Sequence, residues 1–217
     1  MISILIPTKN EPYIQELTNK INKTIKEKHE ILIIDKSSVT PKLKNAKVLR
    51  QKSNGLGNAI LEGLKEAKGD VIVTMDGDGS HDPEDLKKML SKIPEYDIVI
   101  GSKLAKGGAT EDEFSRRIVT NVFDLTARIM LGLKVKDPMT GFMAVKRNIL
   151  EKIKLRPKGF KIVLEVIYKS KAKVTEVPIT FHKRKAGESK VGFNIKGIKE
   201  VFRILRLIIE LRLGVDG

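Results

Sequence analysis

The N-terminal half of the chain alternates short apolar runs with longer segments in which apolar residues recur every three to four positions. Short β-branched runs are typical of strands inside a parallel sheet, and the longer spacing is typical of helices that cover it. The predicted strands are residues 2–7, 31–34, 48–50, 71–75 and 97–100. The predicted helices are residues 12–28, residues 55–67 and one that begins at Asp82 as N-cap. This alternation predicts an α/β fold with a mostly parallel, Rossmann-like central sheet and helices on both faces.

The C-terminal half is less regular. Its pattern predicts helices at residues 114–133 and 160–170, with extended segments at 142–145 and 173–181. Residues 182–190 are basic and contain glycine, which is typical of a mobile loop. No repeat or linker is visible, so we expect one catalytic domain at residues 1–192, followed by a C-terminal amphipathic helix at 193–217.

Basic and apolar residues of this C-terminal segment fall on different sides of a helix that runs from Phe193 to Leu213. A basic amphipathic helix is suited to lie in a membrane interface. Packing against the domain itself or against a partner is the alternative.

Polar residues follow several predicted strands at the point where each strand ends. Asp76 and Asp78 come directly after residues 71–75, and Asp35 and Lys103 follow two other strands. In open α/β sheets, ligands bind beyond the carboxyl ends of the strands. Two carboxylates at that edge repel each other unless a cation lies between them, and Mg²⁺ or Mn²⁺ prefers such oxygen ligands. A plain turn at Gly77 is the alternative, because Asp-Gly is common in turns.

The net charge and the amino-acid composition limit the kinds of partner and metal site that the chain can have. The formal net charge of +15 predicts an anionic partner, namely nucleic acid, anionic lipid or a phosphate-bearing substrate. The chain lacks cysteine and has only three histidines, which excludes disulfides and thiolate metal sites and disfavours a zinc site. It lacks tryptophan, so aromatic platforms for single-stranded nucleic acid are few. With no visible signal peptide or membrane span, we expect a cytoplasmic protein in peripheral contact with the cytoplasmic face of a membrane.

Six motifs occur in the order found in one known family. They are residues 6–11, 35–38, 55–59, 76–81, 137–142 and 181–190. On these motifs the chain resembles family 2 glycosyltransferases with the glycosyltransferase A fold, and within them the polyprenyl-phosphate (dolichol-phosphate) mannosyltransferases. It departs from that pattern at Lys36, where the family often has a second acid, and at Ser80, where it often has glutamine.

The resemblance implies a metal-dependent, inverting transfer of a hexose, mannose, from the nucleotide sugar GDP-mannose to a polyprenyl (dolichyl) phosphate. It implies Mg²⁺ or Mn²⁺ as cofactor, held by Asp76 and Asp78. The implied catalytic residues are Asp78, Lys103 and Arg184. The implied donor-binding residues are Pro7, Thr8, Asn10, Glu11, Asp35, Asp76, Gly77, Asp78 and Lys190. The implied ligands of the acceptor phosphate are Lys103, Arg116, Arg117 and Arg184.

Other residues have narrower expected roles. Asp137 and Glu165 are candidates for contacts with sugar hydroxyls or, with a hydroxyl acceptor, for a general base. We expect His81 to support the loop that carries the acidic pair, and His182 to be a surface residue.

Two other functions remain open from the sequence. One is a family 2 glycosyltransferase whose acceptor is a hydroxyl of a glycan or small molecule. The other is a basic nucleic-acid-binding module, which would explain the charge but not the acids at the strand ends, since these repel phosphate. We therefore expect no nucleic-acid partner. The sequence leaves the oligomeric state undetermined.

Overall fold

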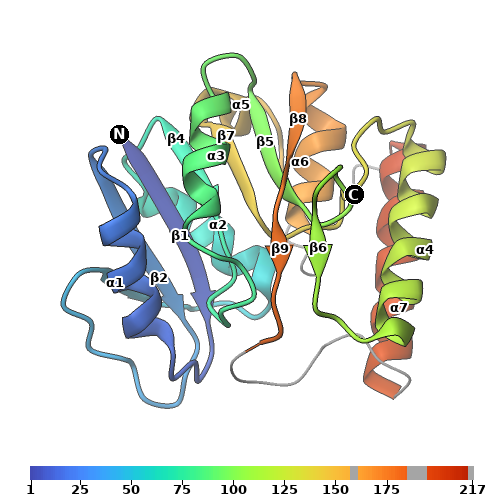
Figure 1. The fold of residues 1–217 in the computed structure, drawn as a ribbon. Coiled ribbons are helices and arrows are strands. Elements are labelled where there is room, and N and C mark those ends of the chain that lie inside the picture. The colour runs from blue at the N-terminus through green and yellow to red at the C-terminus, as the bar shows by residue number, and fades with distance from the viewer. Residues whose placement is uncertain (157–160, 185–194, 215–217) are drawn as a thin grey trace.

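A seven-stranded sheet forms the centre of the computed structural model, which describes residues 1–156, 161–184 and 195–214 (Figure 1). The strands in spatial order are β3 (Lys47–Arg50), β2 (His29–Asp35), β1 (Ile2–Thr8), β4 (Val71–Thr74), β7 (Met143–Lys146), β5 (Ile98–Ser102) and β8 (Val174–Pro178). All neighbours pair in parallel except β7, which runs antiparallel to β4 and β5. The predicted mostly parallel sheet is confirmed.

Side chains alternate between the two faces of the sheet, because successive residues of a strand point in opposite directions. Ile4 and Ile6 of β1 pack under α1 (Ile14–Thr24) and α3 (Asp85–Lys92). Leu5 faces the other side, which α2 (Leu56–Glu66), α5 (Arg147–Glu151) and α6 (Ile162–Ser170) cover. The two apolar layers bury the sheet on both faces, as the sequence predicts.

A third apolar cluster joins α4 (Phe114–Leu131) and α7 (Ile195–Leu213) to α6. Phe123 and Ala127 of α4 pack there with Leu207 and Ile208 of α7. One face of the C-terminal helix therefore packs against the rest of the chain, which is the alternative that the sequence analysis gave to a membrane interface. Figure 1 shows α4 and α7 side by side, beyond the small parallel sheet of β6 (Ala109–Thr110) and β9 (Thr180–Phe181). In the part of the chain that is described, no helix has the length and apolar character to span a membrane.

Some predicted boundaries were wrong. The first helix ends at Thr24 rather than residue 28, because buried Ile25 is already extended as the chain turns toward β2. The third begins at Asp85, and Asp82 instead accepts a hydrogen bond from the backbone N–H of Glu84 in the preceding turn. The helix predicted at 114–133 ends at Leu131, because Gly132 adopts the left-handed conformation that terminates helices.

Candidate active site

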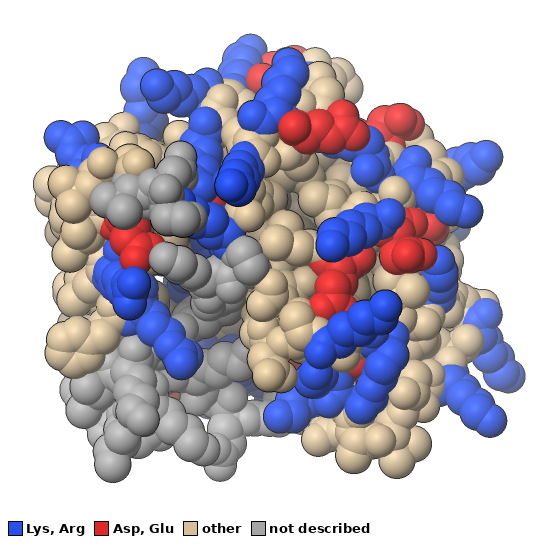
Figure 2. All heavy atoms as spheres, turned by 180° about the vertical axis from the view of Figure 1, so that it is seen from behind, with Lys and Arg blue, Asp and Glu red and all other residues tan. Residues whose placement is uncertain are grey.

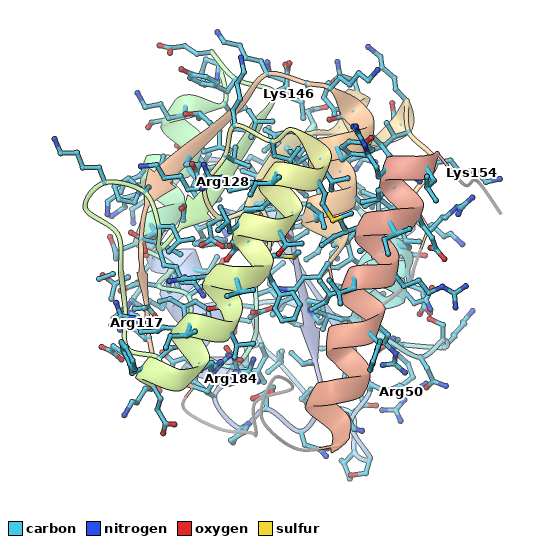
Figure 3. All side chains as sticks on the ribbon, turned by 90° about the vertical axis from the view of Figure 1, so that its right-hand side faces the viewer. Arg50, Arg117, Arg128, Lys146, Lys154 and Arg184 are labelled. Carbon is cyan, nitrogen blue, oxygen red and sulfur yellow. The ribbon has the colours of Figure 1, made fainter. Side chains whose placement is uncertain are left out.

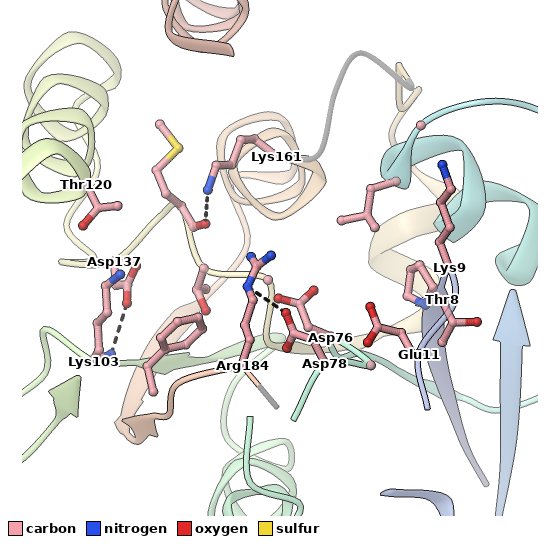
Figure 4. Close-up of a pocket in the computed structure, with 18 of the residues that line it drawn as sticks. Thr8, Lys9, Glu11, Asp76, Asp78, Lys103, Thr120, Asp137, Lys161 and Arg184 are labelled. Atoms are coloured by element: carbon pink, nitrogen blue, oxygen red, sulfur yellow. Dashed lines mark hydrogen bonds and ion pairs between the residues drawn. The ribbon is translucent and has the colours of Figure 1, made fainter. Parts of the chain in front are cut away.

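An open cleft of about 460 Å³ lies at the carboxyl edge of the sheet, where β1 and β4 run side by side but their connections leave in opposite directions (Figure 4). The end of β1, the loop after β4, the loop after β5 and the turn before β7 line it, together with α4. The turn before β7 reaches this edge only because β7 is antiparallel.

Asp76 and Asp78 both line this cleft. Asp78 is buried, and its Oδ1 accepts hydrogen bonds from the backbone N–H (3.0 Å) and hydroxyl (2.6 Å) of Ser80. Gly77 packs inward, since an added Cβ would lie 2.8 Å from Cγ2 of Thr8. The glycine is thus required by packing against β1, a constraint that the sequence analysis did not identify.

His81 supports the acidic loop, as expected. Its Nδ1 accepts a hydrogen bond from the backbone N–H of Asp76 (3.2 Å), and its ring stacks on Phe142 with centroids 4.7 Å apart. Burial lowers the pKa of His81, which favours the neutral imidazole that this hydrogen bond requires.

The turn from Asp137 to Gly141 connects the acidic pair with the other end of the cleft. A Cβ at Gly141 would lie 3.2 Å from both carboxylate oxygens of Asp76, so a side chain here would push that carboxylate away from the turn. At the start of the turn, Oδ2 of Asp137 accepts the backbone N–H of Lys103 at 3.1 Å. A shift of this turn would therefore move both ends of the site.

Asp124 and Lys161 both bind the backbone of this turn, and both line the cleft. Oδ1 of Asp124 accepts the backbone N–H of Met139 at 3.1 Å, and Nζ of Lys161 donates to the carbonyl of the same residue at 2.6 Å. The other carboxylate oxygen of Asp124 is buried and has no hydrogen-bond partner within the described residues. Burial and the charge of Asp137 raise the pKa of Asp124 to about 7, while burial lowers the pKa of Lys161 to about 8.

Asp124→Asn is expected to stabilise the protein in a pH-dependent way. Since the ordinary aspartate pKa is about 3.9, between about pH 4 and 7 the folded state keeps a proton on Asp124 that the unfolded chain has released. The contribution of Asp124 to the free energy of unfolding therefore falls as pH rises through this window. Denaturant titrations should show the advantage of the variant growing between pH 4.5 and 7 by on the order of 2 kcal/mol. A difference independent of pH would contradict this assignment.

Three cationic side chains, those of Lys103, Arg116 and Arg184, also line the cleft. Asp112 holds two of them, with Oδ1 2.9 Å from a terminal nitrogen of Arg116 and Oδ2 3.9 Å from Nζ of Lys103. Both cations line the cleft. Arg184 also lines it, with its Nε 2.9 Å from Oδ2 of Asp78 (Figure 4). Three of the predicted phosphate ligands are thus brought to one cleft.

The predicted donor residues fall into two groups. Pro7, Thr8 and Glu11 line the cleft together with the acidic loop. Asn10 and Asp35 do not line it. The backbone N–H of Asn10 donates to Ser37, and buried Asp35 accepts hydrogen bonds from Thr8 and Arg50, so both brace the loops around the cleft.

The remaining predicted residues lie elsewhere. Arg117 is exposed on α4 and does not line the cleft. Glu165 of α6 is buried, pairs with Lys169 at 2.7 Å and does not line the cleft, so the structure contradicts its interpretation as a sugar contact. His182 is half-exposed beside Glu111, as expected for a surface residue. Lys190 lies outside the described residues.

The cleft also contains three residues that the sequence analysis did not single out: Thr120, Asp124 and Lys161. Thr120 and Asp124 follow the predicted Arg116 at intervals of four residues on one face of α4. The spacing of four residues is visible in the sequence and could have identified Thr120 and Asp124 as neighbours of Arg116 on the predicted helix. Lys161 carries no local signal, because only the fold brings it beside Met139.

The acidic pair fits a divalent cation of the kind that takes its remaining ligands from a substrate. Among the described residues, no group of three or more histidine, cysteine or acidic side chains could form a closed metal site. Mg²⁺ commonly binds through one or two carboxylates plus phosphate oxygens and water. Asp76 and Asp78 supply that number of carboxylates in the cleft.

Residues 3–154 match the family described as glycosyl transferase family 2. The chain belongs to glycosyltransferase family 2. It is 38% identical to a dolichol-phosphate mannosyltransferase of Pyrococcus furiosus over 97% of this chain and 63% of that protein, so it spans less than two thirds of that relative. It is 28% identical to a dolichol-phosphate mannosyltransferase of Saccharomyces cerevisiae over 99% of this chain and 89% of that protein.

Solved structures confirm the glycosyltransferase A fold. This glycosyltransferase superposes with a TM-score of 0.68 on glucosyl-3-phosphoglycerate synthase of Mycobacterium tuberculosis, crystallised with Mn²⁺, UDP-glucose and glycerol 3-phosphate. The match covers 100% of this chain and 81% of that one. Because the identity is only 16%, the match shows a shared fold and nothing about the reaction.

Proposed function

We propose that this glycosyltransferase transfers mannose from GDP-mannose to the phosphate of a polyprenyl phosphate, with inversion and with a divalent cation at Asp76 and Asp78. The names of the Pyrococcus and yeast relatives support mannose transfer to a prenyl phosphate. The Mn²⁺ reported with the mycobacterial synthase supports a divalent metal. A location at the cytoplasmic face of the membrane stays a prediction.

One arrangement carries the proposal. The cleft has an acidic pair at the β1–β4 edge and, facing it, two cations that share Asp112. A diphosphate with its cation suits the acidic side, and an anionic acceptor suits Lys103 and Arg116, because arginine binds phosphate through two parallel hydrogen bonds. The cleft thus offers a pair of carboxylates for the cation on one phosphate-bearing substrate and two cationic side chains for the other.

The chemistry then needs little proton transfer. A phosphate monoester is largely ionised at neutral pH, so its oxygen can attack the anomeric carbon without a general base. As that bond forms, the bond from the anomeric carbon to the diphosphate breaks and GDP leaves. A bound cation would neutralise the charge that develops on the leaving diphosphate. Lys103, Arg116 and the turn at Asp137 would orient the attacking phosphate.

A hydroxyl acceptor is the second candidate, and Asp124 favours it. A hydroxyl needs a general base, and a carboxylate with a pKa raised to about 7 is suited to that role. Two acceptor assays separate the candidates. Transfer to a short-chain prenyl phosphate but not to the corresponding prenol supports the phosphate acceptor, and the reverse result supports the hydroxyl.

The donor is testable by thermal shift, since a ligand that binds only the folded state raises Tm. At about 100 times its Kd, a ligand stabilises by about 2.7 kcal/mol, which raises Tm by about 5–10 °C for a chain of this size. We expect GDP-mannose with Mn²⁺ to give such a shift, and UDP-glucose with Mn²⁺ to give less. Removal of the metal with EDTA should abolish most of it. A shift that EDTA leaves unchanged would contradict the metal assignment.

A further inference from the structure

The order of the strands fixes the order of the cleft residues along the edge of the sheet. β2 lies two places from β4 on one side, and β5 lies two places from it on the other. Lys36 follows β2, the acidic pair follows β4 and Lys103 follows β5, and all of them line the cleft. The acidic pair therefore lies between Lys36 and Lys103. Figure 4 shows the same order, with this pair between Lys103 on one side and Thr8 on the other.

A nucleotide sugar is an extended ligand in which the diphosphate separates the nucleoside from the sugar. A cation at Asp76 and Asp78 would hold the diphosphate in the middle of the cleft, and the sugar would point toward the acceptor at Lys103. The base would then lie toward β2, where Lys36 and Gln51 line the cleft. This placement of the base rests on the proposed function, because the proposed donor is a nucleotide sugar.

The carboxylate nearest to this end of the cleft is not free to bind a base. Asp35, the last residue of β2, is fully buried and does not line the cleft. Its oxygens accept hydrogen bonds from Thr8 and Ser37, and Arg50 pairs with it at 3.2 Å. Figure 3 shows Arg50 at the same end of the molecule as Arg184 of the cleft. The N–H groups of a base therefore do not meet an available carboxylate at Asp35.

Lys36 presents hydrogen-bond donors instead, and the structure holds it in place. Its backbone N–H donates to the carbonyl of Thr8 at 2.9 Å. Its Nζ donates to the carbonyls of Gln51 at 3.4 Å and Lys52 at 3.3 Å. Glu62 fixes that loop in turn by accepting the backbone N–H of Lys52 at 2.8 Å. A lysine ammonium has three N–H donors and no acceptor, so one donor remains beyond these described contacts.

We infer that Lys36 binds a carbonyl oxygen of the donor's nucleobase and so selects a base that carries a carbonyl where others carry an amine. Guanine presents O6 and N7 as acceptors along one edge, whereas adenine has an amino group beside N7. Uracil and cytosine differ in the same way at C4. An ammonium donates to a carbonyl but finds no acceptor on an amino group, so it favours guanine over adenine and uracil over cytosine.

Positive charge alone does not single out Lys36. Figure 2 shows Lys and Arg spread over the face of the molecule seen from behind. A lysine that contacts the diphosphate raises the affinity for every nucleotide by a similar factor, because all nucleoside diphosphates share that group. A lysine that contacts the base changes the ratio of affinities between bases. The ratio is therefore the quantity that tests the inference.

Calorimetric titration of the full chain with nucleoside diphosphates and Mn²⁺ measures this ratio. GDP and IDP share the carbonyl at C6, and ADP has an amine there. We expect the parent to bind GDP and IDP at least about tenfold more tightly than ADP. Lys36→Met keeps the length of the side chain without its donors, and it should bring the three Kd values within about threefold of one another. UDP against CDP makes the same comparison for a pyrimidine, and the larger ratio identifies the base.

Two further variants control for charge and for folding. Lys36→Arg keeps the donors and should keep the preference for the carbonyl. Lys52→Met removes a neighbouring exposed charge that does not line the cleft, and it should leave the ratios unchanged. An equal loss of affinity for GDP, IDP and ADP in Lys36→Met would assign the residue to the diphosphate and overturn the inference. A parent without a preference in either pair would also overturn it, whether or not Lys36→Met folds.

The same titrations separate this inference from the proposed function, because binding is measured without transfer. A parent whose base preference depends on Lys36 but which transfers no mannose would refute the reaction and leave the base contact standing. Transfer from GDP-mannose with a base preference that survives in Lys36→Met would support the reaction and refute the base contact. A parent that binds none of these nucleotides with Mn²⁺ would refute both.

Discussion

Asp78→Asn is expected to lower kcat by about a thousandfold or more while leaving the fold intact. The amide keeps an oxygen that can accept the hydrogen bonds from Ser80, which are 3.0 and 2.6 Å long. It removes the negative charge that would hold the cation on the leaving diphosphate. We therefore expect the free energy of unfolding to change by no more than about 1 kcal/mol. Steady-state transfer assays and denaturant titrations measure the two effects separately.

Asp97→Asn is the matched control. Asp97 precedes β5 at the opposite edge of the sheet, where its carboxylate pairs with Lys146 at 3.0 Å. The same change of charge there should leave kcat within about twofold, because Asp97 does not line the cleft. Full activity of Asp78→Asn would remove this residue from the metal site, and with it the main support for the diphosphate assignment.

The sequence predicted the edge of the sheet correctly because strand ends are encoded locally. A β-branched run followed by acids, as at residues 71–78, fixes both a strand and its terminal carboxylates within eight positions. The antiparallel direction of β7 was not predictable in this way, because the short apolar run at residues 142–145 carries no signal of strand direction. The direction of β7 determines which edge of the sheet the turn at Asp137 reaches. It therefore determines whether this turn lines the cleft.

Long-range contacts also determine which predicted residues line the cleft. Asp35 follows a strand just as Asp76 does, but Thr8 and Arg50 occupy its oxygens, and no local pattern shows this. Arg116 and Arg117 are adjacent in sequence, yet the helix turns Arg116 toward Asp112 and the cleft and turns Arg117 toward solvent. Residue type and position after a strand identified candidates, and side-chain direction within the fold selected among them.

Arg184→Ala is expected to have opposite effects on metal binding and on turnover. Its Nε lies 2.9 Å from Oδ2 of Asp78, so the guanidinium competes with a cation for this carboxylate. Removing it should tighten binding of Mn²⁺ alone, seen as a larger rise in Tm at a fixed Mn²⁺ concentration. Turnover should fall by about a hundredfold, because the guanidinium would otherwise stabilise the phosphates once the cation holds Asp78.

Lys183→Ala controls for the loss of one positive charge beside the cleft. Lys183 is adjacent in sequence and exposed, and only its backbone N–H makes a described contact, with Glu111 at 2.9 Å. We expect it to change neither Mn²⁺ binding nor turnover beyond about twofold. Arg184→Lys adds a second comparison, since lysine keeps the charge but lacks the planar fork. If Arg184 were only structural, Arg184→Ala would lower Tm and weaken Mn²⁺ binding together. The opposing signs expected here distinguish a residue that exchanges partners, from Asp78 to substrate phosphate, from one that simply holds the loop.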